Sequence, residues 1–433
     1  MKTIAFFHPH CSAGGGGERV LWKAIEALAE LNDEGLKIQV AIYTSDDRKE
    51  RYAQEVLQKV NERFAIKIPS TLSLKFVHIP KKRDPSTFKR LTLVAESVDT
   101  IKLAWNSLNQ FTPDIFVDTT GCAFTFLVAK LALCKVIAYV HYPTVSTDML
   151  QLVWERRPTY NNSSTLTKSS LATYIKLIYY SIFAIAYGLI GSLSDVVMVN
   201  STWTYNHIHF LWRFARKRMH IVYPPCDVQS LQSFQIEKRD NMILSIGQFR
   251  PEKDHPLQIK SFARLRKRVQ NHPKLHDVRL ILVGSCRGES DENRVGELRK
   301  LAQSLGIAEH VEFVLNQPFP VLKEYFSKAS VGLHTMWNEH FGIGVVEMQA
   351  AGLLTIAHNS GGPKSDIIKP NKTGLLASTE EEYANAMYTA CIDGLDNEKC
   401  KQLRSSGRQS STRFSDEVFN VSFKKLLLES KCI

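Results

Sequence analysis

The feature that most constrains this fold is a unit of short apolar strand, turn and amphipathic helix, which recurs along nearly the whole chain. Residues 3–7 are apolar and partly β-branched or aromatic, residues 14–17 are four glycines, and residues 18–31 carry apolar side chains at helical spacing. Comparable apolar runs follow at 38–43, 115–118, 136–141, 195–200, 242–246, 279–283, 311–313, 331–334 and 355–357. Strands that alternate with helices predict parallel, doubly wound sheets of the α/β class.

Two sheets of this kind fit a chain of 433 residues, since domains average about 150 residues. The consecutive prolines Pro224 and Pro225 follow a short strand and predict a hinge. We therefore expect two Rossmann-like domains that face each other across a ligand cleft, at 1–222 and 223–412. The remaining residues, 413–433, are expected to form a helix that packs back on the N-terminal domain.

The charge balance favours anionic partners. Lys and Arg total 55 against 43 Asp and Glu, a net charge of +12. Basic clusters lie at 81–83 with Lys89 and Arg90, at 213–218 and at 264–268. Such clusters usually form solvated faces, but those in the N-terminal half could also contact anionic lipid. Nucleic acid is not an expected partner, because the basic residues are scattered and lack an aromatic stacking motif.

The cysteines and the N-terminal residues indicate the cellular compartment of the protein. The eight cysteines contain no C-x-x-C pair, which predicts a reducing compartment without a disulfide framework or a structural metal. The first eight residues read as a buried strand, because the apolar run is too short for a signal peptide.

One segment, 174–193, is unusually apolar and has Lys176 as its only charge. Its length approaches the roughly 20 residues that cross a bilayer. A spanning helix would separate the strands before and after it, so we do not expect it to span. Two alternatives remain, a buried core helix or a helix lying in the membrane interface. We favour the interface, because an outer helix of an α/β domain normally keeps one polar face.

The most specific chemical pattern is the pair Glu339 and Glu347, with Gly342 and Gly344 between them, directly after the strand predicted at 331–334. Glycines let main chain approach a ligand closely, and a helix that begins here would point its free N–H groups at an anion. The alternative is an ordinary acidic first turn with a surface glutamate. The two glycines at the junction favour a ligand site.

Three further features follow predicted strands. Arg250 and Lys253, in the loop after 242–246, could neutralise a diphosphate. The glycines at 14–17 could cradle an anion, although they match neither the dinucleotide fingerprint nor a Walker A motif. His141 directly follows a predicted strand, a position where ligands often bind, although a lone histidine is more often structural.

The chain contains no Asp-x-Asp motif of the kind that holds a divalent cation. We therefore expect no metal, and we expect protein groups to neutralise the phosphates. Residues 359–363 read as a turn.

The E-x7-E pattern of Glu339 and Glu347 resembles that of the retaining family-4 glycosyltransferases, which have the GT-B fold. Five segments are similar in sequence to the α-1,2-mannosyltransferases of asparagine-linked glycosylation, namely residues 14–20, 139–143, 222–227, 247–255 and 338–352. The resemblance covers nearly the whole chain. It implies GDP-mannose as donor and Man3GlcNAc2-diphosphodolichol, then its Man4 product, as acceptor, with retention of configuration. It also implies the cytosolic face of the endoplasmic reticulum membrane and a place beside other mannosyltransferases of the pathway.

The resemblance also implies roles for individual residues. Glu347 would bind the ribose hydroxyls, and Glu339 would hold the transferred sugar together with the main chain of Phe341, Gly342, Ile343 and Gly344. Lys253 would bind the diphosphate, and His141 would lie near the donor sugar. Gly15 and Gly16 would approach phosphate or acceptor.

The chain departs from the family pattern at Gln248, where members usually carry an arginine, so that role would pass to Arg250. Members often have an N-terminal hydrophobic anchor, which does not precede Met1 here, so membrane association would fall to 174–193 in a shorter form of the enzyme. The rival hypotheses are a transferase for another nucleotide sugar, an epimerase, and a non-catalytic scaffold subunit of a glycosylation complex.

Overall fold

The computed structural model describes residues 1–47, 50–83, 91–146, 170–273, 275–392, 398–430 and 432–433. The basic residues Lys89 and Arg90 lie outside them. The described chain divides into two compact units. One consists of Met1–Pro225 with Glu417–Ile433, and the other consists of Cys226–Asp416. The division thus falls directly after the double proline.

The first unit is a parallel sheet of seven strands in the order β3-β2-β1-β4-β5-β6-β7. Its strands are β1 (Lys2–Phe7), β2 (Ile38–Thr44), β3 (Ser73–His78), β4 (Ile115–Asp118), β5 (Lys135–Val140), β6 (Val196–Val199) and β7 (Met219–Ile221). Its helices are α1 (Gly16–Asp33), α2 (Tyr52–Phe64), α3 (Thr92–Gln110), α4 (Thr125–Leu131), α7 (Ser170–Gly191), α8 (Thr202–Leu211), the 3-10 helix η2 (Arg213–Arg218) and α16 (Asp416–Glu429).

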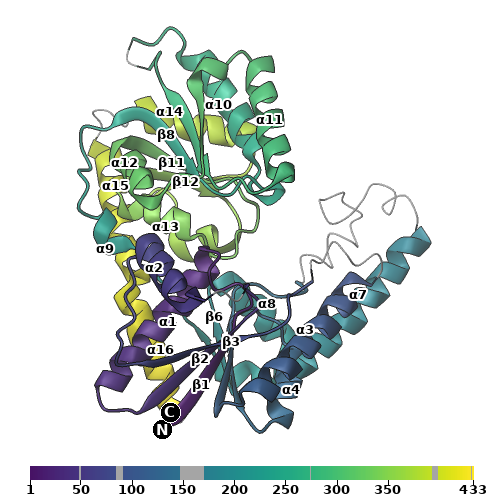
Figure 1. Ribbon diagram of the computed structural model, residues 1–433. Helices are drawn as coiled ribbons and strands as arrows, with labels where there is room; N and C mark the ends of the chain where they lie inside the picture. Colours follow the sequence, from purple (N-terminus) through teal and green to yellow (C-terminus); the bar gives the residue numbers. More distant parts are fainter. Residues whose placement is uncertain (48–49, 84–90, 147–169, 274, 393–397, 431) are drawn as a thin grey trace. The chain divides into compact units, whose positions relative to one another are not determined.

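The central strands of this sheet are buried on both faces. In β1, Ile4 and Phe6 join the core under α1, α2 and α16, while Ala5 and Phe7 join the core under α3, α4, α7 and α8. Figure 1 shows α3, α4 and α7 side by side. The helix expected at the C-terminus forms as α16 and packs its phenylalanines into this unit, with Phe419 6.3 Å from Tyr139 between ring centroids.

The second unit is a parallel sheet of six strands in the order β10-β9-β8-β11-β12-β13. Its strands are β8 (Asp240–Ile246), β9 (Arg279–Gly284), β10 (Val311–Leu315), β11 (Ala329–Leu333), β12 (Leu354–His358) and β13 (Leu375–Ala377). Its helices are α9 (Val228–Leu231), η3 (Pro251–Lys253), α10 (His255–Val269), α11 (Glu289–Ser304), η4 (Ala308–His310), α12 (Phe319–Lys328), α13 (Ile343–Ala350), η5 (Pro363–Ile367), α14 (Glu380–Ile392), α15 (Glu398–Ser411) and η6 (Thr412–Phe414).

Both sheets have the same doubly wound strand order, which confirms the predicted fold class. In each sheet the first three strands extend from the centre to one edge, and the later strands extend from the first strand to the other edge. The order therefore reverses between β1 and β4 in one unit and between β8 and β11 in the other. Ligands of open α/β sheets bind at the carboxyl ends of the strands at this switch point.

The glycines at 14–17 differ from the predicted loop. Gly14 has φ +79°, Gly15 is the N-cap of α1, and the last two glycines already belong to its first turn. The side chain of Glu18 accepts a hydrogen bond from the Gly15 N–H at 2.6 Å and stabilises this early helix start. Helix α8 is capped by Ser201, whose side chain accepts a hydrogen bond from the Thr204 N–H.

The apolar segment forms α7, a helix long and apolar enough to cross a membrane by length and composition alone. It connects β5 and β6, which pair with each other in one sheet. Phe183 and Tyr187 pack inward, and Gly188 and Gly191 allow close contact, because a Cβ on Gly191 would lie 2.1 Å from Trp212. The opposite face is exposed, so α7 is not the fully buried core helix of the first alternative.

Candidate active site

The predicted donor-site residues come together at the switch point of the second unit. Lys253 lies at the end of η3 in the loop that follows β8, and Glu339 lies in the loop that follows β11. The two strands are neighbours in the sheet. Their loops therefore emerge side by side, although the residues are far apart in sequence.

A partly buried carboxylate is the centre of this site. The ammonium group of Lys253 donates to Glu339 Oε2 at 2.6 Å, and His334 Nε2 lies 3.1 Å from the same oxygen. The Glu339 side chain is only 14% exposed. Burial acts to raise the pKa of Glu339, but Lys253 and then His334 outweigh it and hold that pKa well below 4.5. The carboxylate is therefore ionised at neutral pH.

A second histidine, His255, lies close to Lys253 and feels its charge. His255 stacks on Phe249, with ring centroids 4.8 Å apart. Burial, together with the charges of Lys253 and Arg294, lowers the pKa of His255 to about 4. The ring is thus neutral near pH 7. Among the described residues no group of three or more His, Cys, Asp or Glu side chains is placed to hold a metal ion.

Helix α13 begins at this site. Its N-cap, Gly342, has φ +108°, a conformation that side-chain-bearing residues rarely adopt, and its carbonyl accepts hydrogen bonds from Val345 and Val346. The N–H groups of Ile343 and Gly344 precede these first helical hydrogen bonds and are available in the manner of any helix N-terminus. Glu347 lies one turn further on and is partly exposed.

Two glycines predicted as an ordinary turn support the Glu339 loop. A Cβ on Gly361 would lie 2.3 Å from the Glu339 carbonyl oxygen, and one on Gly362 would lie 2.5 Å from Phe341 Cα. The Gly362 N–H donates to the Glu339 carbonyl at 2.7 Å. The residues 359–363 therefore fix the main chain that carries the carboxylate. Only glycine allows this approach.

The other predicted basic residue, Arg250, is exposed and directly precedes η3. Its neighbour Gln248 is partly buried, and its carbonyl accepts the Arg250 N–H at 2.8 Å. Lys253 packs its side chain over Gly247, where a Cβ would lie 3.5 Å from Lys253 Cδ. The loop thus directs Lys253 at Glu339 and leaves Arg250 at the surface.

The switch point of the first unit carries the other predicted residues. His141 directly follows β5, and a Cβ on Gly17 would lie 3.6 Å from its Nε2. The structure therefore brings His141 and the glycine segment together. Gly16 is exposed, whereas the N–H of Gly15 is already bound to Glu18.

His8 and Thr119, which no sequence motif indicated, lie beside His141 and the glycine segment. His8 Nδ1 lies 2.6 Å from Thr119 Oγ1, and its Nε2 lies 3.4 Å from Glu18 Oε1. Burial acts to raise the pKa of Glu18, but the contacts with His8 lower it overall. His8 and Glu18 thus fix the start of α1. His8 directly follows β1 and Thr119 directly follows β4, and these positions at strand ends were the available signal.

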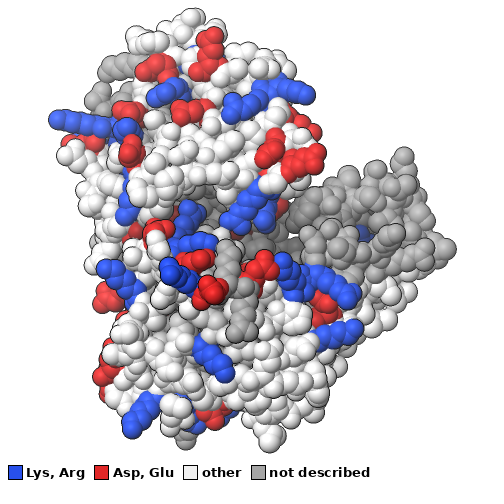
Figure 2. Space-filling view, viewed as in Figure 1, with Lys and Arg blue, Asp and Glu red and all other residues white. Residues whose placement is uncertain are grey.

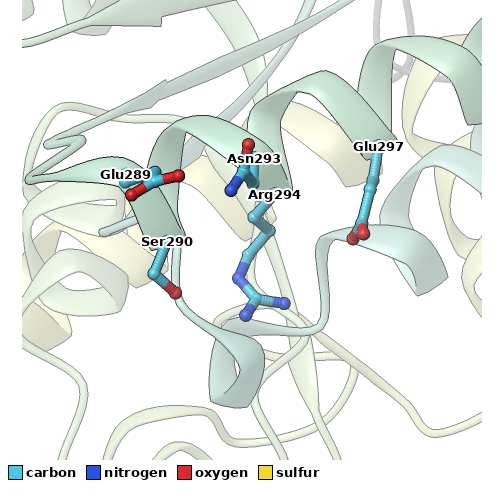
Figure 3. Close-up of a pocket in the computed structure, with 5 residues that line it drawn as sticks. All are labelled: Glu289, Ser290, Asn293, Arg294 and Glu297. Atoms are coloured by element: carbon cyan, nitrogen blue, oxygen red, sulfur yellow. The ribbon is translucent and has the colours of Figure 1, made fainter.

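A separate pocket of about 420 Å³ lies along α11. It is lined by Glu289, Ser290, Asn293, Arg294 and Glu297, and Figure 3 shows the side chains of Ser290, Arg294 and Glu297 on one side of that helix. The charge of Arg294 reaches His255 and contributes to its lowered pKa. No sequence motif predicted this pocket.

The surface charges are largely mixed. Figure 2 shows acidic side chains beside basic ones over the face in view. In the cluster predicted at 264–268, Arg264 contacts Glu380 and Glu381 at 3.2 Å, and Arg268 also contacts Glu381. This cluster is a solvated, ion-paired face, as expected for most such clusters.

The chain resembles known proteins over nearly its full length. It matches the family "ALG11 mannosyltransferase N-terminus" over residues 1–212 and "Glycosyl transferases group 1" over 206–410. It is 46% identical to the GDP-Man:Man(3)GlcNAc(2)-PP-Dol alpha-1,2-mannosyltransferase of Homo sapiens, covering 98% of this chain and 86% of that one. The protein of the same name from Dictyostelium discoideum is 41% identical, with 98% and 84% covered.

Solved structures show the same fold. Sucrose-phosphate synthase from Thermosynechococcus elongatus matches with a TM-score of 0.67 and 17% identity, covering 99% of both chains. Anabaena HepE in complex with UDP and glucose matches with a TM-score of 0.63 and 16% identity, again covering 99% of both. The fold is GT-B, and the enzyme class is glycosyltransferase rather than epimerase or scaffold. The chain belongs to the family of GDP-Man:Man(3)GlcNAc(2)-PP-Dol alpha-1,2-mannosyltransferases.

Proposed function

We propose that this enzyme transfers mannose from GDP-mannose, in α-1,2 linkage and with retention, to Man3GlcNAc2-diphosphodolichol and then to the Man4 product. The observation that carries the proposal is the Lys253–Glu339 pair beside the N-terminus of α13. It lies in a chain 46% identical to enzymes named for this reaction. Cations and main-chain N–H groups suit a nucleotide diphosphate, and a carboxylate can accept hydrogen bonds from the hydroxyls of a sugar. This edge of the sheet supplies all three.

The charges at the site suit the departure of a diphosphate. Cleavage of the sugar–phosphate bond develops negative charge on the leaving group and positive charge at the anomeric carbon. Lys253 and the N–H groups at the start of α13 would stabilise the diphosphate, and the exposed Arg250 can extend to it. We propose that these protein groups act without a metal. Transfer activity that persists after EDTA treatment would support this proposal. Loss of activity in EDTA that added Mg²⁺ restores would contradict it.

The two glutamates have different roles in this proposal. Glu339 is ionised and held on one oxygen, so its other oxygen can accept a hydrogen bond from the transferred mannose. Glu347 lies one turn into α13 and is partly exposed, which suits a ribose hydroxyl. Neither glutamate is assigned as a nucleophile. Retention would arise from attack on the same face, with the leaving phosphate accepting the proton of the acceptor hydroxyl. Trapping a mannosyl–carboxylate adduct would contradict that step.

The direct test is transfer from radiolabelled GDP-mannose to lipid-linked Man3GlcNAc2. UDP-glucose and an acceptor without mannose serve as controls. We expect Glu339→Ala and Glu347→Ala to abolish most transfer. Glu309→Ala is a matched control, because Glu309 is exposed in η4 of the same unit. Full activity of Glu347→Ala, or an unchanged Glu339→Ala, would overturn the site assignment.

We further propose that the first unit lies on the cytosolic surface of the endoplasmic reticulum membrane through α7 and its neighbours. The outer face of α7 carries exposed apolar side chains, among them Ile182 and Ile185 at 64% each. Adjacent elements add Leu133 at 92% and Phe214 at 74%. A soluble surface seldom exposes so much contiguous apolar area.

Basic residues accompany this apolar face. Arg213, Arg216 and Lys217 are exposed in η2, next to Phe214, and η2 packs against α7. A basic rim beside apolar side chains suits anionic headgroups, each basic residue contributing about 1 kcal/mol. A shared membrane would also place the enzyme beside the mannosyltransferases that make its lipid-linked acceptor.

Flotation with vesicles of phosphatidylcholine and phosphatidylserine tests membrane binding. We expect binding that weakens with salt and is lost in Ile182→Asp/Ile185→Asp. Leu305→Asp is the control, because Leu305 is an exposed apolar residue in the other unit. Unchanged flotation of the double variant would refute the α7 surface, and salt-independent binding would remove the role of the basic residues.

A further inference from the structure

His334 is a buried residue at the centre of the site that no motif identified. It directly follows β11 and is only 6% exposed. Its N–H donates to the carbonyl of Ile356 at 2.9 Å, and its own carbonyl accepts the hydroxyl of Tyr383 at 2.9 Å. Strand β12 and helix α14 therefore fix its main chain from two sides.

The side chain of His334 points its Nε2 at Glu339 Oε2, 3.1 Å away. The other nitrogen, Nδ1, is buried and has no hydrogen-bond partner in the described part of the chain. A proton on Nδ1 would be a buried donor without an acceptor, which is costly. The hydrogen bonds therefore place the proton on Nε2, where it is donated to the carboxylate.

Two donors thus meet on one oxygen of Glu339. Lys253 arrives on a flexible chain from the loop after β8, whereas His334 is a rigid ring at the end of β11. Both bind Oε2, so the carboxylate is fixed in rotation and Oε1 is turned elsewhere. When a diphosphate competes for Lys253, the contact from His334 does not depend on that lysine.

We infer that His334 is a positioning residue, which holds the Glu339 carboxylate in the orientation that receives the transferred sugar while Lys253 engages the diphosphate. The inference rests on the proposed function of Glu339. His334 itself does not touch substrate in this account. It acts through one hydrogen bond, from its Nε2 to Glu339 Oε2.

The geometry gives a sharp set of variants. The amide nitrogen of glutamine can reach the place of Nε2, whereas that of asparagine reaches only the place of Nδ1. We expect His334→Leu and His334→Asn to lower kcat by about 10- to 100-fold, the usual loss for a hydrogen bond to a charged group. His334→Gln should recover most of that loss. KM for GDP-mannose and inhibition by GDP should change little, because neither diphosphate nor ribose contacts His334.

The controls separate positioning from a structural role. His276→Leu removes an exposed histidine of the same unit and should have no effect. In a Glu339→Ala background, His334→Leu should cost little further activity, because the group on which it acts is gone. Thermal unfolding of each variant identifies any that fail to fold. If His334→Leu fails to fold, the comparison of His334→Gln with His334→Asn still tests the positioning role.

Each result has a defined meaning. Equal activity of His334→Gln and His334→Asn, or a full additional loss in the Glu339→Ala background, would overturn the inference. So would wild-type kcat in a folded His334→Leu variant while Glu339→Ala is inactive. An active Glu339→Ala variant would instead refute the proposed site. Failure of the inference and failure of the function are therefore distinguishable.

Discussion

Replacing Lys253 by methionine tests the electrostatic core of the site. Methionine keeps most of the aliphatic chain that packs over Gly247 and removes the ammonium group, which lies 2.6 Å from Glu339 Oε2. Loss of one fixed charge-stabilising group costs about 3 kcal/mol of transition-state stabilisation. At about 1.4 kcal/mol for each factor of ten, kcat should fall about 100-fold.

A second effect follows from the carboxylate that remains. Lys253 is the largest influence that lowers the pKa of Glu339, against burial, which raises it. Without the lysine, this pKa should rise toward or above its ordinary value of 4.5. A depressed carboxylate pKa contributes stability above the unfolded pKa, and that stability is lost as pH falls through the folded pKa. In Lys253→Met, stability and activity should therefore begin to fall at a higher pH than in the wild type.

The assay is initial-rate transfer from GDP-mannose to lipid-linked Man3GlcNAc2 between about pH 3 and pH 8, a range that includes the acid limb of Glu339, with urea unfolding over the same range. Lys260→Met is the matched control, because Lys260 lies on α10, half exposed, 3.8 Å from Glu380. A folded Lys253→Met variant with kcat within about threefold of wild type would refute the assigned role, since about 100-fold is expected. An unshifted acid limb would refute the coupling to Glu339.

Three further predictions concern the framework. Gly342→Ala should lower the free energy of unfolding by about 1–3 kcal/mol and impair transfer, because φ is +108° at this position. The control in thermal unfolding is Gly296→Ala in the middle of α11, where a Cβ would meet no atom within 4 Å, and this change should be neutral or stabilising. Burial raises the pKa of Asp118 to about 6, so its contribution to stability should fall by about 2 kcal/mol as pH rises from about 4 to about 6. Asp118→Asn should flatten this urea-unfolding profile. Ser201→Ala should cost about 1 kcal/mol in chemical denaturation, through loss of the cap on Thr204.

The central strands could be predicted from the sequence because both faces of a parallel sheet are covered. Such strands are continuous apolar runs, as in the residues of β4 and β12. The three strands that the pattern missed or barely indicated lie at sheet edges. β3 alternates polar and apolar residues, and β7 and β13 have three residues each. An edge strand has less covered surface, so its sequence carries less signal.

The site shows the same limit for a different reason. Glu339, Gly342 and Glu347 share one loop and helix, so their spacing in sequence already indicates a site. His334 looks like the last residue of a strand, and the contact between Lys253 and Glu339 exists only because β8 and β11 are neighbours. Strand order is a property of the whole sheet. Local patterns therefore single out candidate residues but cannot show the contacts between them.

The C-terminal end of α13 bears on the proposal that the N-terminus of this short helix binds an anion. Its last carbonyls, Ala350 and Ala351, accept hydrogen bonds from Arg408 at 3.0 Å, and Ala351 also accepts one from the buried Arg239. Burial lowers the pKa of Arg239 to about 10, so it remains a cation at neutral pH. Cations at a helix C-terminus stabilise the helix dipole. The eight residues of α13 are thus held at one end by the buried Arg239 and the partly exposed Arg408. In the proposed function, the opposite end would meet a diphosphate without first having to become ordered.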